Sequence, residues 1–470
     1  MEPSFGPPLS TRSARKLLAL TVVIVAALRL PWVMYPFLNL DEGVHAAIAD
    51  AILEGGLPYR DAVDHRGPVL YYLYAAIFWL AGRNNMAAVH VVLILLVLGI
   101  VILVYLMGAR LWSRRVGCWA AVLFGIFNLT GHRGAVLAFE PEWALIAFST
   151  LGASSLLRAL PEGRPWWLAL SGASFALAFC SKQTGLFDLL AALGFLVMVQ
   201  TTKGHRLRRA FASVLPMILG FAAVIGAVVG FFWFAGAFEE FWFYAVTYNT
   251  HYYAAAVPLA KRLAMGIALE HQFFREHQLL LALSLTGSIL IVSRCIRRQH
   301  RRDVDVLNGV FPVLWGLAGY AGAVSPGRDS DKYFIQLLPA ACLVAGYTMT
   351  AVVDALKSFS AAEQRHARVL RLLIAALFAV GVYVPLSMDG SMLKTFVRTR
   401  LGLATNPDVP SGSFKELVDV IRTRSSERDR LFVWGWYAEL YALTGRRPAS
   451  RYVFCTFLTG LIGSSKSLGE

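Results

Sequence analysis

Carboxylates and cations are concentrated in one stretch that follows the first apolar segment of this chain. The stretch NLDEGVHAAIADAILEGGLPYRDAVDHRGP, residues 39–68, carries six carboxylate residues: Asp41, Glu42, Asp50, Glu54, Asp61 and Asp64. It closes with His65 and Arg66, just before an aromatic apolar run. A positioned carboxylate can take a proton from a hydroxyl nucleophile, and a cation can hold a phosphate whose charge grows as it leaves. The stretch is therefore a candidate site for acid–base chemistry beside an anion.

Asp41 and Glu42 are predicted to begin a short amphipathic helix. Val44, Ala47 and Ile48 recur at helical spacing, which predicts a helix lying along a membrane surface with Asp41 at its N-terminal end. The plainer alternative is a solvated loop in which an aspartate caps a helix, a common arrangement. For Arg66, the corresponding alternative is a membrane anchor whose guanidinium reaches the lipid headgroups.

Three further segments carry candidate groups. Glu142 follows Pro141, which is expected to start a helix, and it is placed to point into a cavity; Glu140 is explained by the helix dipole. Lys182 lies in a short turn between two apolar runs, where it either reaches headgroups or meets an anion. Arg133 belongs to the segment that precedes these glutamates.

Lys332 and Arg328 stand just before another apolar run, in GRDSDKYFIQLLPA, with two aspartates as neutralising partners. The alternative for this segment is a surface ion-pair network worth about 0–1 kcal/mol. The loop histidines show no spacing that predicts a metal site.

The composition excludes an ordinary soluble protein. Of the 470 residues, 57% are hydrophobic and 16% are charged, whereas soluble domains average about 25% charged residues. The net charge of +15 is dispersed between apolar runs, which argues against nucleic acid as a partner. The five cysteines form neither a disulfide framework nor a CxxC site.

The chain contains twelve apolar runs, and eleven of them are predicted to cross a membrane. The run PVLYYLYAAIFWLAG is short and rich in Tyr and Trp, so it is assigned to the outer interface. With that assignment the turns predicted to be cytoplasmic, together with the N-terminus, hold nearly half of the 44 basic residues. All of the candidate groups then lie on the outer face.

This assignment predicts an all-α polytopic membrane protein with two parts. Residues 1–388 form a transmembrane catalytic domain, with interfacial helices in a first outer loop at 36–85 and a second outer loop at 238–277. Residues 389–470 have a composition typical of soluble proteins and are predicted to form a small outer α/β segment at the C-terminus.

Taken together, these segments resemble a known family. The stretch LDEGVHAAIADAILEGGLPYRDAVDHRGPVLYYLYA, with EPEWALIAF, LAFCSKQTGL, DKYFIQLLPA and WGWYAELYALTGRRPASRYVF, is similar to bacterial glycosyltransferases of the dolichyl-phosphate-mannose protein mannosyltransferase-like family, in the GT-C superfamily. The resemblance covers most of the chain. Arg66 stands where relatives carry Lys in a K-P-P motif, so HRGP departs from that pattern at two positions.

The resemblance implies a function and assigns roles to residues. It implies transfer of a sugar, with inversion, from a polyprenyl-phosphate donor to an acceptor hydroxyl or amine at the periplasmic face of a bacterial inner membrane. Asp41 would be the base, assisted by Glu42 and Glu142. The phosphate would be held by cationic and polar side chains: Arg66, Lys182, Lys332, Arg133, His65 and Arg328.

Two points remain open at the level of the sequence. Some GT-C enzymes hold a divalent cation, and Asp41 and Glu42 could supply oxygen ligands to Mg²⁺ or Mn²⁺. The alternative function is a membrane transporter or a flippase for lipid-linked sugars, in which ionisable residues line a pathway. Transporters usually carry internal repeats, and this chain shows none.

Overall fold

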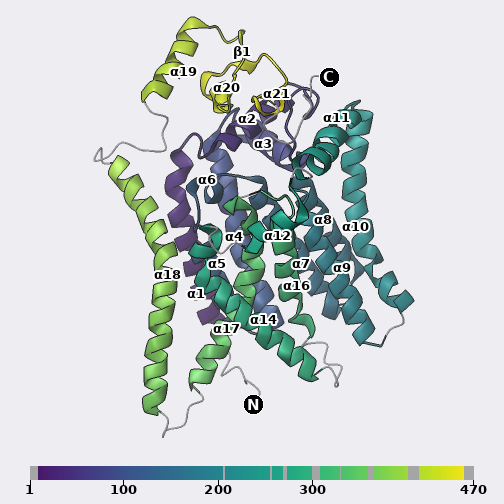
Figure 1. Ribbon diagram of the computed structural model, residues 1–470, viewed down its shortest axis with the longest axis vertical. Helices are drawn as coiled ribbons and strands as arrows, with labels where there is room; N and C mark the ends of the chain where they lie inside the picture. The colour runs from purple at the N-terminus through teal and green to yellow at the C-terminus, as the bar shows by residue number, and fades with distance from the viewer. Residues whose placement is uncertain are drawn as a thin grey trace.

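The computed structural model describes residues 9–162, 164–204, 207–254, 257–267, 272–298, 307–328, 330–357, 364–400 and 412–459. Within these ranges the chain is nearly all helical, as the composition predicts. Long helices run roughly parallel in one bundle, and shorter helices cover one end of it (Figure 1).

Among the described residues, seven segments are long and apolar enough to cross a membrane: Thr11–Met34, Met86–Leu111, Pro141–Leu160, Gly185–Thr202, Phe211–Phe234, Gln278–Arg297 and Asp331–Lys357. They correspond to α1 (Thr11–Arg29) with η1 (Leu30–Met34), α4 (Met86–Leu111), α7 (Pro141–Glu162), α9 (Gly185–Thr202), α10 (Leu207–Phe234), α14 (Gln278–Arg298), and η4 (Asp331–Leu337) with α17 (Leu338–Lys357).

Four more helices belong to the same bundle: α5 (Arg114–Phe127), α8 (Pro165–Ser181), α16 (Phe311–Val324) and α18 (Gln364–Arg400). Helix α8 packs along α7 and α10, and α5 packs along α4 and α17. Helix α18 continues beyond residue 388, where the sequence suggested a domain boundary.

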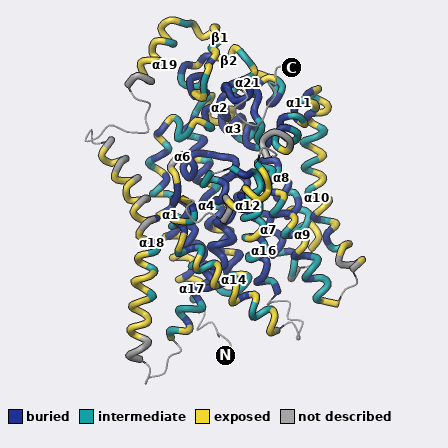
Figure 2. The backbone as a smooth tube through the Cα atoms, in the orientation of Figure 1, coloured by how far each residue is buried: buried dark blue, intermediate teal, exposed yellow. Residues whose placement is uncertain are grey.

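The first outer loop forms α2 (Leu40–Leu53) and α3 (Pro68–Ala81) at one end of the bundle (Figure 1). Asn39 caps α2, because its side-chain oxygen accepts a hydrogen bond from the Glu42 backbone N–H at 2.9 Å. Asp41 is therefore not the cap. Most of α2 is buried, so this helix lies between the bundle and the C-terminal segment and not on an open surface (Figure 2).

The remaining outer elements are short. They are α6 (Arg133–Val136), α11 (Phe238–Trp242), a π-helical segment η2 (Phe243–Ala254), α12 (Leu259–Ile267) and α13 (Gln272–Glu276).

The C-terminal segment has the mixed character that its sequence predicts. It consists of α19 (Gly412–Arg424), β1 (Arg430–Leu431), α20 (Glu439–Thr444), β2 (Arg447–Pro448) and α21 (Thr456–Thr459), with the two strands parallel. It docks on the first outer loop, where the Val63 N–H donates to the Arg451 carbonyl at 2.8 Å. A Cβ atom at Gly43 would collide with the backbone of Glu439, so α2 and α20 approach closely.

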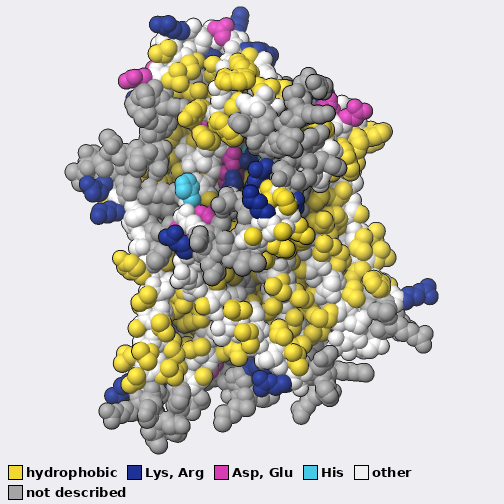
Figure 3. Space-filling view, in the orientation of Figure 1, with side chains coloured by type: hydrophobic (Ala, Val, Ile, Leu, Met, Phe, Trp, Pro, Cys, Tyr) yellow, Lys and Arg dark blue, Asp and Glu magenta, His cyan; other side chains and the backbone are white. Residues whose placement is uncertain are grey.

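The surface divides into two zones. Apolar side chains cover the sides of the bundle over most of its length, whereas acidic and basic side chains lie beyond this apolar zone and in a group just below the C-terminal segment (Figure 3). Large exposed apolar residues such as Leu219, Trp233 and Leu377 belong to the outer helices α10 and α18. This distribution is that of a protein that spans a membrane several times.

Candidate active site

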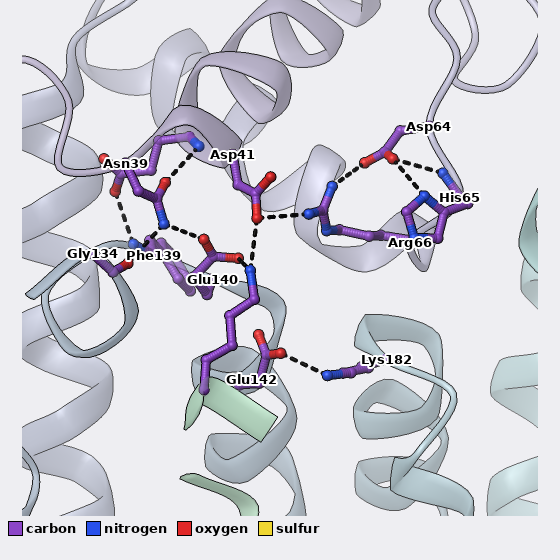
Figure 4. Close-up of polar contacts among 12 residues, drawn as sticks. Asn39, Asp41, Asp64, His65, Arg66, Gly134, Phe139, Glu140, Glu142 and Lys182 are labelled. Carbon is purple, nitrogen blue, oxygen red and sulfur yellow. Dashed lines mark hydrogen bonds and ion pairs between the residues drawn. The ribbon is translucent and has the colours of Figure 1, made fainter. Parts of the chain in front are cut away.

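Asp41 is at the centre of an ion-pair cluster built from segments far apart in sequence. Its Oδ2 atom accepts from Arg66 Nη2 at 2.7 Å and from Lys332 Nζ at 2.7 Å. Arg66 comes from the loop between α2 and α3, and Lys332 comes from η4. The Asp41 side chain is 30% exposed, so the cluster is open to an incoming ligand. Figure 4 shows Asp41 facing Arg66 on one side and Glu140 on the other.

Arg66 is fixed by a second carboxylate. Its Nη1 atom donates to Asp64 Oδ2 at 2.7 Å, and the Tyr71 hydroxyl donates to the same oxygen at 2.8 Å. Asp64 is fully buried. A Cβ atom at Gly67 would collide with the Cys180 carbonyl at the end of α8. The missing side chain therefore lets this loop rest on α8, which brings Arg66 close to the turn that carries Lys182.

The two glutamates around Pro141 face different cations. Lys332 Nζ lies 3.4 Å from Glu140 Oε2, and the Asn39 side-chain amide donates to Glu140 Oε1. Glu142 Oε1 accepts from Lys182 Nζ at 2.6 Å. The Lys182 ammonium also lies 3.5 Å from the centroid of the Tyr333 ring. The predicted Glu142 and its neighbour Glu140 thus both contact cations of this group, and Lys332 bridges Glu140 to Asp41.

Glu42 points away from this cluster. It is fully buried, and its carboxylate accepts from the Leu38 and Phe139 backbone N–H groups at 2.8 Å each. His90 Nε2 lies 3.1 Å from Glu42 Oε1. Glu42 therefore ties α2 to α4 and to the segment before α7, and the direct catalytic role expected for it from the sequence stays a prediction.

The other predicted phosphate-binding residues are placed less centrally. His65 lies beside Asp64, with 3.0 Å between Nδ1 and Oδ1, and its ring packs near Tyr248 and Phe457. Arg328 is half-buried in the connection between α16 and η4. Arg133 begins α6, and its side chain lies outside the described part of the structure.

The electrostatics of the cluster separate the carboxylates. Burial opposes the charge of Asp41, but Arg66 and Lys332 outweigh it and hold the pKa of Asp41 well below its ordinary value. Burial raises the pKa of Glu140 to about 8, although Lys332 opposes the shift. Burial lowers the pKa of Lys182 to about 8, against the attraction of Glu142. The cations thus favour the ionised form of Asp41, whereas burial favours the protonated form of Glu140.

The residues do not fit a resident metal ion. Within the described ranges, no three His, Cys, Asp or Glu side chains are grouped as a metal site would require. Asp41 is engaged by two cations, and Glu42 is engaged by backbone N–H groups and His90.

Sequence reasoning missed two members of the cluster. Glu140 was attributed to the helix dipole, yet its carboxyl contacts Lys332. Asp64 was one of six carboxylates in the first loop, and only its burial beside Arg66 distinguishes it. The sequence signal for Asp64 is its spacing of two residues from Arg66 in DHRGP.

Comparisons with known proteins agree with this architecture. Residues 65–233 match the family described as dolichyl-phosphate-mannose-protein mannosyltransferase. No curated protein sequence matches the chain significantly.

Solved structures share the fold at low sequence identity. ArnT from Cupriavidus metallidurans bound to undecaprenyl phosphate matches with a TM-score of 0.61 and 14% identity, over 94% of this chain and 86% of that one. The oligosaccharyltransferase of Archaeoglobus fulgidus in the apo form matches with a TM-score of 0.60 and 13% identity, over 94% of this chain and 65% of that one.

A third structure is AglB, the archaeal oligosaccharyltransferase from Archaeoglobus fulgidus, in complex with an inhibitory peptide and a dolichol-phosphate. It matches with a TM-score of 0.56 and 13% identity, over 93% of this chain. The present chain spans 64% of the length of that protein. The resemblance predicted from the sequence is therefore confirmed by the family match over residues 65–233 and by the shared polytopic fold.

Proposed function

We propose, from the family match and the ion-pair cluster that adjoins it, that this protein is a membrane glycosyltransferase. It would transfer a sugar from a polyprenyl-phosphate donor to an acceptor hydroxyl or amine, with inversion at the anomeric carbon and Asp41 as the base. The observation that carries the proposal is the bridging of Asp41 by Arg66 and Lys332, each at 2.7 Å. The carboxylate provides a proton acceptor, and the two cations beside it provide a site for a phosphate.

The donor phosphate would compete with Asp41 for the two cations. A guanidinium binds phosphate oxygens in a bidentate manner, and an ammonium binds them as a point charge. When the phosphate takes Arg66 and Lys332, Asp41 loses the interactions that hold its pKa low. Donor binding would therefore make Asp41 a stronger base at the moment when a base is needed.

The reaction balances with these groups. The acceptor oxygen attacks the anomeric carbon from the face opposite the phosphate, and its proton passes to Asp41. The bond between the anomeric carbon and the phosphate oxygen breaks, and its electron pair stays on the phosphate. The phosphate charge changes from −1 to −2, which Arg66, Lys332 and the nearby Lys182 stabilise.

The structural relatives support the class of donor. One was solved with undecaprenyl phosphate and another with a dolichol-phosphate. We place the site on the periplasmic side of a bacterial inner membrane, because the turns at the opposite end of the bundle carry the basic clusters. The N-terminus would then be cytoplasmic, and the partners would be the lipid-linked donor, membrane lipid and an acceptor from the cell envelope.

The alternative function is a transporter or flippase for a lipid-linked sugar. Transport sites typically lie near the middle of the bilayer, whereas this cluster gathers around α2, which lies with α3 at one end of the bundle (Figure 1). Asp188 on α9 is an exception, but it accepts hydrogen bonds from Ser149 at 2.6 Å and from Gln336 at 3.1 Å, which suits a structural network. The geometry therefore favours the transferase.

The test is sugar release from a panel of polyprenyl-phosphate sugars by the purified protein in lipid nanodiscs. We expect one donor to react, and Asp41→Asn to reduce release by about 10²–10⁴-fold while donor binding persists. The matched control is Asp61→Asn, because Asp61 lies in the same loop but pairs with Arg60 outside the cluster.

Two outcomes would contradict the proposal. Near-normal release by Asp41→Asn would exclude Asp41 as the base. Movement of a labelled lipid-linked sugar across the bilayer without any sugar release would favour the flippase.

A further inference from the structure

His45 is a buried polar side chain that the proposed chemistry has not yet used. It lies on α2, four residues after Asp41, and it is fully buried. Its ring packs beside Tyr71 and Tyr74 of α3, with ring centroids 6.1 and 5.5 Å apart. Within the described structure, neither ring nitrogen has a hydrogen-bond partner. An unsatisfied buried polar group costs about 1–3 kcal/mol, so an apolar ring would pack here at lower cost.

The two tyrosines that flank His45 do not satisfy it. The Tyr71 hydroxyl donates to Asp64, at 2.8 Å, and the Tyr74 hydroxyl donates to the Phe139 carbonyl, at 3.0 Å. The imidazole is therefore held in place by aromatic packing, while its two nitrogens remain available to bind a proton.

Charged groups from three segments face His45. Asp41 on α2 and Asp64 in the following loop favour its protonated form, whereas Arg66 in the same loop and Lys332 on η4 oppose it. Burial and the Arg66 charge together lower the pKa of His45 to about 3, so the ring is neutral in the resting protein. The cations that oppose protonation are the two that bridge Asp41.

We propose that His45 receives from Asp41 the proton that the acceptor releases during sugar transfer, an inference that rests on the proposed function. Side chains at positions i and i+4 lie on one helix face, about 5–6 Å apart at Cβ. Because neither imidazole nitrogen hydrogen-bonds to Asp41, the proton would move from Asp41 Oδ to the ring through an intervening water molecule.

The charge balance of the reaction explains why the proton would stay on His45 only briefly. As the sugar leaves, the phosphate gains one negative charge and neutralises Arg66 and Lys332, so the repulsion that opposes an imidazolium beside them is removed. When the lipid phosphate departs, both cations return to Asp41 and oppose the charge on His45 again. His45 then loses its proton to solvent, and the cluster recovers its resting state.

Proton uptake on ligand binding tests this inference without requiring turnover. Undecaprenyl phosphate would be titrated into the protein by calorimetry between pH 5.5 and 7.5, in buffers of different ionisation enthalpy. We expect the wild type to take up more protons on binding than His45→Phe or His45→Gln. Equal proton uptake by all three proteins would overturn the role of His45, whether or not the protein transfers sugar.

The pH dependence of turnover provides the second readout. His45→Phe fills the same space, and we expect it to lower kcat about 10²-fold with donor affinity unchanged. The decline of kcat at acidic pH should also move to lower pH, because Asp41 alone then sets it. His277→Phe is the matched control, since His277 is also buried but stacks on Phe273 outside the cluster.

The outcomes separate the two proposals. Loss of activity in Asp41→Asn, with wild-type kcat and pH profile in His45→Phe, would leave the transferase in place and reduce His45 to a packing residue. No turnover in the wild type, with proton uptake that depends on His45, would instead contradict the proposed reaction and retain the coupling of His45 to phosphate binding.

Discussion

At the scale of single residues, the site depends on which carboxylates are exposed and which are buried. Asp41 is partly exposed and can meet a ligand, whereas Asp64 is fully buried and serves to orient Arg66. The sequence identified Asp41 and Arg66 from their types and their position after the first crossing. It could not identify Asp64, because local pattern does not reveal which of six neighbouring carboxylates turns inward.

Replacement of Arg66 should destabilise the protein, because Arg66 compensates the buried charge of Asp64. Arg66→Ala leaves that carboxylate without its ion-pair partner, and breaking a buried pair costs about 3–5 kcal/mol. Arg66→Lys keeps one charge but cannot contact both aspartates in the same way, so its effect should be smaller. Thermal unfolding in detergent measures the loss of stability in both Arg66 variants. Arg60→Ala is the control, because its ion pair with Asp61 is exposed, and a loss equal to that of Arg66→Ala would contradict the argument.

Glu140 should make stability depend on pH. Its pKa in the folded protein is about 8, above the ordinary value of 4.5. The folded state therefore keeps a proton that the unfolded chain releases, and stability is lost as the pH rises from about 4.5 to about 8. Glu140→Gln should flatten the fall of the unfolding temperature across this range, whereas the exposed-site variant Asp61→Asn should not. An unchanged pH dependence in Glu140→Gln would show that another group is responsible.

At the scale of elements, helix α2, which carries Asp41, is fixed from both sides. Glu42 binds it to the segment before α7, and Gly43 lets α20 of the C-terminal segment pack against its backbone. Helical periodicity predicted α2 itself. The contact between α2 and α20 could not be predicted, because nothing local to residue 43 or residue 439 encodes their proximity.

A side chain at position 43 should displace the C-terminal segment. In Gly43→Val the new atoms would collide with the Glu439 backbone, which cannot move as a side-chain end can. Cys455 is buried within this segment, so its reaction with a membrane-impermeant maleimide should accelerate in the variant. Gly99→Val is the control, since a Cβ there meets nothing within 4 Å. Equal labelling rates in the two variants would mean that the contact does not hold the segment in place.

At the scale of the whole molecule, charge distribution was the most informative part of the sequence. Treating one aromatic run as non-crossing led to the prediction of eleven crossings. In the described part of the structure seven helices are long and apolar enough to cross, and the aromatic run forms α3, which lies with α2 at one end of the bundle (Figure 1). Asp41 and Lys332 are 291 positions apart in the sequence, and they come into contact only because the helices pack into one bundle. Sequence could place both residues on one face, but only the fold shows that they touch.

The orientation of the protein in the membrane can be checked by single-cysteine labelling. Arg60→Cys lies in the loop between α2 and α3, whereas Lys203→Cys follows the end of α9 and Arg114→Cys begins α5, at the opposite end of the bundle. In intact cells, with the native cysteines replaced, we expect an impermeant reagent to label position 60 and to spare 203 and 114. The reverse pattern would place the cluster in the cytoplasm and contradict the proposed periplasmic site.

Each cation of the cluster is paired with a carboxylate of the same cluster, and this pairing affects which anions the site selects. Three cations, Arg66, Lys182 and Lys332, face three carboxylates, Asp41, Asp64 and Glu142, while burial favours the uncharged form of Glu140. A site with no net charge offers little long-range attraction to small soluble anions such as free phosphate or nucleotides. A lipid-linked phosphate gains additional free energy from burying its chain, about 0.8 kcal/mol for each CH₂ group. The neutral site would thus favour anions that are already anchored in the membrane over those dissolved around it.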